Sequence, residues 1–334
     1  MKKVKYIASA LGAALAFGWL IWDNMRIEVK SYEVSEEKLA REFAGFKILQ
    51  VSDLHNEAFG KKQKRLISKI RNEAPDIIVI TGDMIDGPKM SNAFDFIREA
   101  VKIAKCYYVS GNHEAWTGLY NDKIKPLLLR YGVKVLDNGS AVIYRNGKAI
   151  NIAGLADPDL DRWNKRRTAS DRLMNLYSRV KPVLYGYAAK VLDGGAYVGA
   201  KKRSGVNEGK RKKYDFEPNG SVVDIADKNL SLLENENYTV LLSHRPELLN
   251  LYSDHKMDLV LTGHAHGGQI RLPVSKRGVI AVDQGLLPQY TEGVYRKGVT
   301  KMIVSRGLGN SVYFPRINNC PQLITVTLTS KQTG

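Results

Sequence analysis

Cysteine is scarce in this chain of 334 residues: only Cys106 and Cys320 are present, which is too few for a disulfide framework. Cys106 lies in the apolar run KCYYVS, so we expect a buried free thiol there rather than a bridge. The sequence also has no internal repeat and no twin-arginine signature. Hydrophobic residues make up 44% of the chain, which is normal for a folded protein with an ordinary core.

Acidic residues are fewer than basic ones, and the net charge of +17 is concentrated in one segment. Residues 162–213 contain 15 lysines and arginines against three acids, so this segment supplies 12 of the 17 net positive charges. Such a segment can contact nucleic acid, anionic lipid or an anionic substrate, or it can be a solvated loop. The charge therefore does not by itself indicate a nucleic-acid-binding protein.

An uncharged stretch near the amino terminus, Tyr6 to Trp22, is 17 residues long and follows three lysines. This length is at the lower edge of what crosses a bilayer as a helix. We expect residues 1–25 to form an uncleaved signal anchor with one membrane-spanning segment, and a cleaved signal peptide is the alternative. The basic start favours a location of the remaining chain outside the cytoplasm. Residues 26–43 are expected to be a linker.

Residues 44–330 alternate strand and helix patterns, which predicts an α/β domain. The segments FKILQVSDLH, PDIIVITGD, KCYYVSGNHE, YTVLLSH, MDLVLTGH, KMIVSRG and QLITVTL read as buried strands. The segment AVIYRNGKAINIAG predicts a hairpin that turns at Asn146-Gly147. Residues 159–220 break the alternation, because they are basic, dotted with tyrosines and rich in glycine toward their end. We interpret them as an insertion.

Strand after strand ends in a polar residue that can bind a metal ion. These residues are Asp53, His55, Asp83, Asn112, His113, His244, His264 and His266. They include five of the six histidines, and only His255 lies elsewhere. Ligands of α/β folds bind at the carboxyl ends of strands, so we expect these side chains to meet at one edge.

Together these side chains form a mixed oxygen and nitrogen ligand set, which suits first-row divalent metals better than magnesium or calcium. There are too many ligands for one ion and enough for two. Two ions roughly 3.5–4 Å apart can share a carboxylate and a bridging hydroxide, which is a strong nucleophile at neutral pH. The set therefore predicts a two-metal centre that attacks a phosphorus ester.

Five segments, in order, resemble the metal-binding motifs of the calcineurin-like metallophosphoesterases: SDLHNE, TGDMID, SGNHEAW, LLSHRPE and TGHAHGG. One such motif alone would mean little, but five in the same order, each after a predicted strand, are specific. The resemblance spans about residues 44–328 apart from the insertion. It implies a four-layer αββα sandwich.

The resemblance also implies roles for individual residues. One ion would be held by Asp53, His55, Asp83 and His266. The other would be held by Asp83, Asn112, His244 and His264, so that Asp83 bridges the two. His113 would protonate the leaving oxygen or stabilise its charge, and Glu114 is a candidate for orienting His113. Manganese is the expected metal, with iron and zinc as alternatives.

A glycine, Gly87, occupies the place where phosphoprotein phosphatases of this superfamily carry an arginine that grips a phosphate dianion. Further segments, among them GHAHGGQIRLP, YTEGVY and CPQLITVTL, resemble the bacterial membrane-anchored branch. This implies hydrolysis of a phosphodiester or pyrophosphate in a cell-envelope or lipid-linked substrate. The expected partners are a lipid bilayer and an anionic phosphoester, with residues 159–220 as a basic lid.

Three other functions stay open at this point. A nuclease is motivated by the basic insertion, although nucleic acid is the less favoured partner. A phosphomonoesterase is disfavoured by Gly87. A non-catalytic scaffold is disfavoured because none of the ligand positions is lost.

Overall fold

The computed structural model describes residues 2–165, 220–233, 236–310 and 315–330. The predicted basic lid at 159–220 therefore lies almost entirely outside the described residues. The part of it that is described belongs to one helix before residue 166 and to the first residue of another at 220.

Among the described residues, the first sheet has six strands in the order β1-β14-β2-β3-β4-β5. Their bounds are β1 (Glu28–Glu36), β14 (Gln322–Ser330), β2 (Lys47–Val51), β3 (Ile77–Thr81), β4 (Lys105–Val109) and β5 (Lys134–Val135). The strands β2 to β5 are parallel, and β14 is antiparallel to β2 and parallel to β1. The sheet is therefore mixed.

The second sheet described has the order β12-β13-β9-β8-β7-β6. Its strands are β12 (Gly293–Lys297), β13 (Thr300–Val304), β9 (Leu259–Thr262), β8 (Tyr238–Leu242), β7 (Lys148–Gly154) and β6 (Gly139–Arg145). The four central strands are parallel, and the two edge strands are antiparallel to their neighbours. The predicted hairpin is confirmed: Arg145 pairs with Lys148, and both turn residues have positive φ, as a two-residue turn requires. A separate short hairpin joins β10 (Ile280–Ala281) to β11 (Gly285–Leu286).

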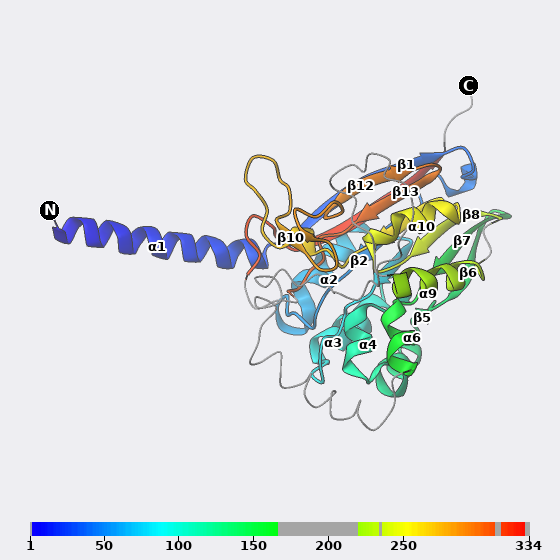
Figure 1. The fold of residues 1–334 in the computed structure, drawn as a ribbon, viewed down its shortest axis with the longest axis horizontal. Coiled ribbons are helices and arrows are strands. Elements are labelled where there is room, and N and C mark those ends of the chain that lie inside the picture. Colours follow the sequence, from blue (N-terminus) through cyan, green and yellow to red (C-terminus); the bar gives the residue numbers. More distant parts are fainter. Residues whose placement is uncertain (1, 166–219, 234–235, 311–314, 331–334) are drawn as a thin grey trace, which may run out of the picture.

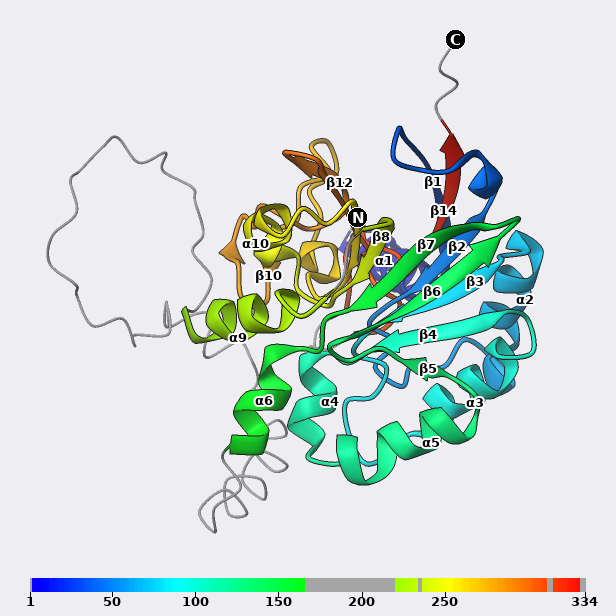
Figure 2. The same ribbon diagram turned by 90° about the vertical axis from the view of Figure 1, so that its right-hand side faces the viewer.

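Helices lie on the outer sides of the two sheets (Figure 2). The described helices are α1 (Lys2–Met25), α2 (Lys64–Glu73), α3 (Ser91–Ala100), α4 (Asn112–Thr117), α5 (Lys125–Arg130), α6 (Pro158–Lys165), α9 (Gly220–Leu230) and α10 (Leu249–Asp254). Short helical turns complete the list: η1 (Arg41–Phe43), η2 (Lys61–Gln63), η3 (Tyr120–Ile124), η4 (Pro246–Leu248) and η5 (His266–Gly268).

The strands divide their apolar side chains between separate cores, because successive residues of a strand face opposite sides. In β2, Ile48 packs between the two sheets, whereas Leu49 packs against the layer that contains α2 and α3. In β8, Leu242 packs between the sheets and Leu241 packs against α9 and α10. The layers therefore follow the order helix, sheet, sheet, helix. The predicted α/β fold with this layering is confirmed.

The strand β1 lies in the segment 26–43, where the sequence pattern indicated no regular structure. Its outer position in the sheet leaves most of its side chains partly exposed, and only Val34 is buried. A strand of this kind has no continuous apolar run, so sequence reasoning missed it. The two cysteines are free and buried, as predicted for Cys106.

The amino-terminal segment forms the single helix α1, which projects from the body of the molecule (Figure 1). Within the described residues, no helix has both the length and the apolar content that a membrane crossing needs. This finding contradicts the prediction of a single-pass membrane protein with a transmembrane anchor, and that prediction is wrong. The uncharged stretch has 17 residues, roughly 26 Å of helix against a hydrocarbon core of about 30 Å. Alanine, glycine and serine, which gain little from transfer into lipid, make up much of it.

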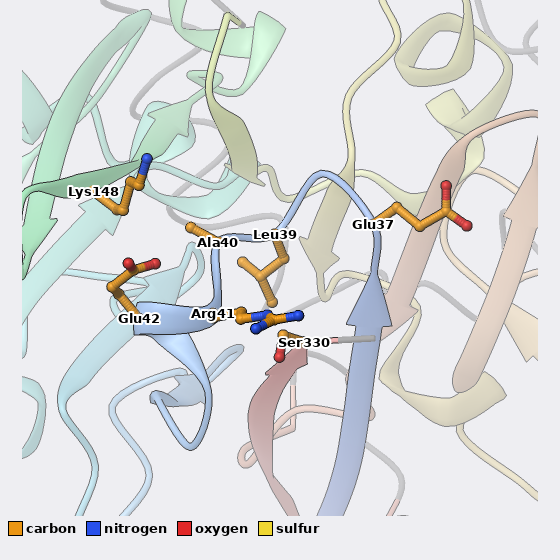
Figure 3. A pocket seen from close by; sticks show the side chains of 7 residues that line it. All are labelled: Glu37, Leu39, Ala40, Arg41, Glu42, Lys148 and Ser330. Carbon is orange, nitrogen blue, oxygen red and sulfur yellow. The ribbon is translucent and has the colours of Figure 1, made fainter. Parts of the chain in front are cut away.

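The two sheets turn the carboxyl ends of their parallel strands toward the same edge, where the loops after β2, β3, β4, β8 and β9 meet. A surface pocket lies at the opposite edge, beside the end of β14 and the start of β7 (Figure 3). It is lined by Glu37, Leu39, Ala40, Arg41, Glu42, Lys148 and Ser330. The pocket contains none of the predicted metal ligands.

Candidate metal centre

Six of the seven predicted metal ligands form two adjacent clusters at the carboxyl edge of the sheets, and all seven are buried. The first cluster contains Asp53, His55 and His266. The Nε2 atom of His266 lies 3.2 Å from His55 Nε2 and 3.4 Å from Asp53 Oδ1. Three ligand atoms thus surround one point, although the residues come from segments more than 200 positions apart in the chain.

The second cluster contains Asp83, His244 and His264. The Nε2 atom of His244 lies 3.1 Å from Asp83 Oδ2 and 3.1 Å from His264 Nδ1. The other ring nitrogen of His244 is 2.7 Å from the carbonyl oxygen of Thr81, so that Nε2 is the nitrogen turned toward the cluster. A backbone carbonyl in this position fixes the orientation of a ligand histidine.

Asp83 lies between the two clusters. Its Oδ2 atom is 3.7 Å from His55 Nε2 in the first cluster, besides its contact with His244 in the second. The clusters also approach each other through Asp53 Oδ1 and His244 Nε2, which are 4.0 Å apart. Asp83 is therefore placed where a carboxylate shared by two ions would stand.

The donor set fits divalent cations. Asn112 begins α4 beside the clusters, and its buried Oδ1 atom has no hydrogen-bond partner among the described residues. Burial lowers the pKa of His55 well below its usual value, and the neighbouring His113 lowers it further. Burial also lowers the pKa of His266, with His55 adding to the effect. Both rings are thus held in the neutral form that binds metals.

Five of the seven candidate ligands have backbone conformations in the left-handed region. Their φ angles are 51° for Asp53, 48° for His55, 52° for Asp83, 66° for His264 and 47° for His266. Non-glycine residues rarely adopt this region, and each instance costs about 1–3 kcal/mol. Twelve other non-glycine residues of the described chain also have a positive φ, so this conformation is frequent among the ligands without being confined to them.

Glycines let the ligand loops approach one another closely. A Cβ atom on Gly111 would lie 2.2 Å from Asp83 Oδ1, and one on Gly263 would lie 2.2 Å from Asp53 Oδ2. No side chain fits at such distances, so glycine is needed at both positions. The close contact between the loops after β3 and β4 is what brings Asp83 to its central place.

Glu114 joins the same two loops. Its Oε2 atom accepts hydrogen bonds from the amides of Asp83 and Gly111, both at 2.8 Å, and its Oε1 atom accepts from Met84 and Ile85. Burial and the charge of Asp83 raise the pKa of Glu114 to about 7, although the backbone amides act in the opposite direction. Glu114 was expected to orient the His113 ring, whereas its hydrogen bonds hold the backbone that carries Asp83 and Asn112.

His113 lies at the more accessible side of the centre. Its amide donates to Asp83 Oδ1 at 2.9 Å, and its Nε2 atom lies 3.9 Å from Asp83 Oδ2. The side chain is 16% exposed, whereas the metal-facing rings are closed off from solvent. Its ring packs between those of His55 and Trp116. This is a suitable place for a group that meets a bound substrate.

The sequence assigned no role to Arg245 or His255. In the structure, only Arg245 lies beside the metal-ligand clusters. His255 lies outside both clusters and pairs with Asp227 at 2.7 Å. Arg245 is buried beside His244 and forms ion pairs with Asp157 at 2.8 Å and Asp283 at 2.7 Å. Its position in SHRPE, directly after a predicted ligand, was the only signal available. Asp283 follows the apolar run VIAV, which was not among the predicted strands.

Comparison with known proteins agrees with this geometry. Residues 46–268, more than half of the chain, match the calcineurin-like phosphoesterase family. The chain is 26% identical to the uncharacterized metallophosphoesterase YkuE of Bacillus subtilis over 97% of this chain and 93% of that protein. It is 24% identical to the UDP-2,3-diacylglucosamine pyrophosphatase LpxG of Chlamydia muridarum over 90% of each chain. A dimetal phosphatase of Danio rerio aligns over 79% of this chain and 88% of that one, with 13% identity and a TM-score of 0.42.

Gly111 lies against Asp83, where the loops after β3 and β4 meet. Gly111→Ala should weaken Mn²⁺ binding about tenfold or more, because the added methyl group must displace the Asp83 carboxylate. Isothermal titration of the metal-free protein measures the affinity. Gly87→Ala is the matched control, since a Cβ atom there meets nothing within 4 Å. Equal affinities of the two variants would show that this contact does not position Asp83.

Proposed function

The chain belongs to the calcineurin-like phosphoesterase family, and from this premise we propose that it hydrolyses a phosphodiester or pyrophosphate bond. Membership makes it a metallophosphoesterase, a hydrolase. The observation that carries the proposal is the pair of ligand clusters that meet at Asp83. Such a pair is the arrangement with which two-metal hydrolases clamp both the attacking and the leaving oxygen of an in-line displacement.

We assign the ligands as the clusters group them. Asp53, His55 and His266 would hold one ion, and His244, His264 and Asn112 the other, with Asp83 shared. Manganese is the ion we propose, since the mixed set of carboxylate, amide and imidazole ligands suits first-row metals. When bound, the two ions would supply Lewis acidity and a water ionised at neutral pH.

The chain's own groups then position the substrate and move a proton. His113 stands beside the centre on its accessible side, with its amide fixed on Asp83. From there its imidazole can donate a proton to the oxygen that leaves phosphorus, or stabilise the charge on that oxygen. Glu114 accepts four hydrogen bonds from backbone amides, and these bonds hold Asp83 and α4 in fixed positions relative to each other.

The charges around the centre favour a diester or pyrophosphate over a monoester dianion. Arg245 is engaged by carboxylates on several sides. Arg316 is fully buried and donates to the carbonyl oxygens of Arg306 and Gly309 and to Nδ1 of His266. Neither guanidinium is free to grip an extra phosphate charge, and Gly87 supplies none. Similarity to LpxG, whose name describes cleavage of a lipid-linked pyrophosphate, supports a substrate of that class.

A panel of three substrates tests the proposal. Protein reconstituted with Mn²⁺ should turn over UDP-2,3-diacylglucosamine and bis(p-nitrophenyl) phosphate with a kcat/KM at least about tenfold above that for p-nitrophenyl phosphate, a difference of roughly 1.4 kcal/mol. Release of UMP from the first substrate and of p-nitrophenol from the other two measures the rates. Asp83→Ala should abolish turnover of all three, and His255→Ala is the control outside the clusters. Preference for the monoester would overturn the substrate class.

The role of His113 can be tested through the leaving group. His113→Ala should lower kcat about 10²–10⁴-fold for a substrate with a poorly acidic alcohol, because that oxygen needs a proton. For a p-nitrophenyl diester, whose leaving group departs as an anion, the loss should be much smaller. Bound metal, measured by elemental analysis, should stay at the wild-type level. Equal losses on both substrates would show that His113 does not act on the leaving oxygen.

A further inference from the structure

The two ring nitrogens of His264 contact different groups. Nδ1 lies 3.1 Å from His244 Nε2, on the side of the metal-ligand cluster. Nε2 points the other way and lies 3.1 Å from Asp283 Oδ2. A neutral imidazole carries a single N–H, so a ring that donates from Nε2 presents a lone pair at Nδ1. The contact with Asp283 therefore decides which nitrogen of His264 can bind an ion.

Asp283 reaches this place from the short hairpin between β10 and β11. The two strands pair at only two positions, and the carboxylate is 47% exposed, so the hairpin alone would restrain it weakly. Its φ angle of 58° lies in the left-handed region, where a non-glycine residue is strained.

Arg245 supplies the missing restraint. Its Nη1 atom donates to the same Oδ2 atom of Asp283 at 2.7 Å, while its Nε and Nη2 atoms bind Asp157 at 2.8 and 3.1 Å. The guanidinium is buried, so these charge-assisted bonds are strong ones. Asp283 is thus held by two donors: an arginine fixed on its far side and the imidazole.

A further metal ion is the alternative reading of this place, because Glu247, His264 and Asp283 bring three ligand atoms close together. The guanidinium of Arg245 already occupies the position of the cation, at 2.7 Å from Asp283 and 3.4 Å from Glu247 Oε1. The geometry supports a ligand-holding network and not an additional ion.

We propose that Asp283 is a positioning residue of the metal centre: its carboxylate, held by Arg245, accepts from Nε2 of His264 and so turns Nδ1 toward the ion. This proposal rests on the proposed function, because it takes His264 to be a metal ligand. A carboxylate behind a histidine ligand also raises the basicity of the ring, and its loss typically weakens metal affinity about 10–100-fold. The effect should be confined to the ion that His264 binds.

Mn²⁺ titration of the full-length protein tests the proposal. Asp283→Ala should weaken one of the two binding events about 10–100-fold and leave the other unchanged. Asp283→Asn should lose less, since its amide oxygen still accepts from Nε2. Asp227→Ala is the matched control: it removes the carboxylate of another Asp–His pair, with a contact of 2.7 Å, that lies outside both clusters. It should leave both affinities unchanged.

A second readout does not depend on affinity. Long-range ¹H–¹⁵N correlation spectra of the Zn²⁺-loaded protein should show His264 with its proton on Nε2 in the wild type, and this signature should be lost or exchange-broadened in Asp283→Ala. Unchanged affinities, or an unchanged tautomer, would overturn the positioning role. Wild-type protein that binds no Mn²⁺ at all would instead overturn the proposed function, so the two failures are distinguishable.

Discussion

The placement of one carboxylate, that of Asp83, is the constraint on which the rest of the site depends. It contacts His244 at 3.1 Å and His55 at 3.7 Å, and so lies between two groups of ligands, each of which combines residues from both sheets. A buried carboxylate among imidazoles is costly unless cations or hydrogen bonds compensate it. Gly111 allows the Asp83 carboxylate to approach the neighbouring loop closely. Glu114 fixes the backbone of both loops by accepting hydrogen bonds from the amides of Asp83 and Gly111.

The site contains backbone conformations and contacts that are unfavourable without a bound cation. Five ligand residues lie in the left-handed region, and ring nitrogens of neighbouring histidines face each other at little more than 3 Å. Neither feature stabilises the fold by itself. Both persist because two packed sheets, with a shared apolar core between them, over-determine the loops at their carboxyl edge. The free energy of cation binding would offset this strain, so bound cations would stabilise the folded protein.

Much of this arrangement was predictable from the sequence because each principal ligand follows an apolar strand. Asp53, Asp83 and His244 close the segments whose burial fixes the sheets, so topology alone brings them to one edge. Asp283 was missed although it follows the apolar run VIAV, because that run forms only the two-residue strand β10 of a small hairpin. The strand β1 escaped notice because only Val34 is buried in it. Glu114 was identified but was expected to contact His113, because hydrogen bonds to backbone amides cannot be recognised from a sequence.

In the proposed site, seven side chains bind two ions and Asp83 is shared between them. Anomalous diffraction from crystals grown with Mn²⁺ measures this directly. We expect two peaks roughly 3.5–4 Å apart, one beside His55 and His266 and the other beside His244 and His264, each within bonding distance of Asp83. A single peak, or two peaks of which only one contacts Asp83, would contradict it.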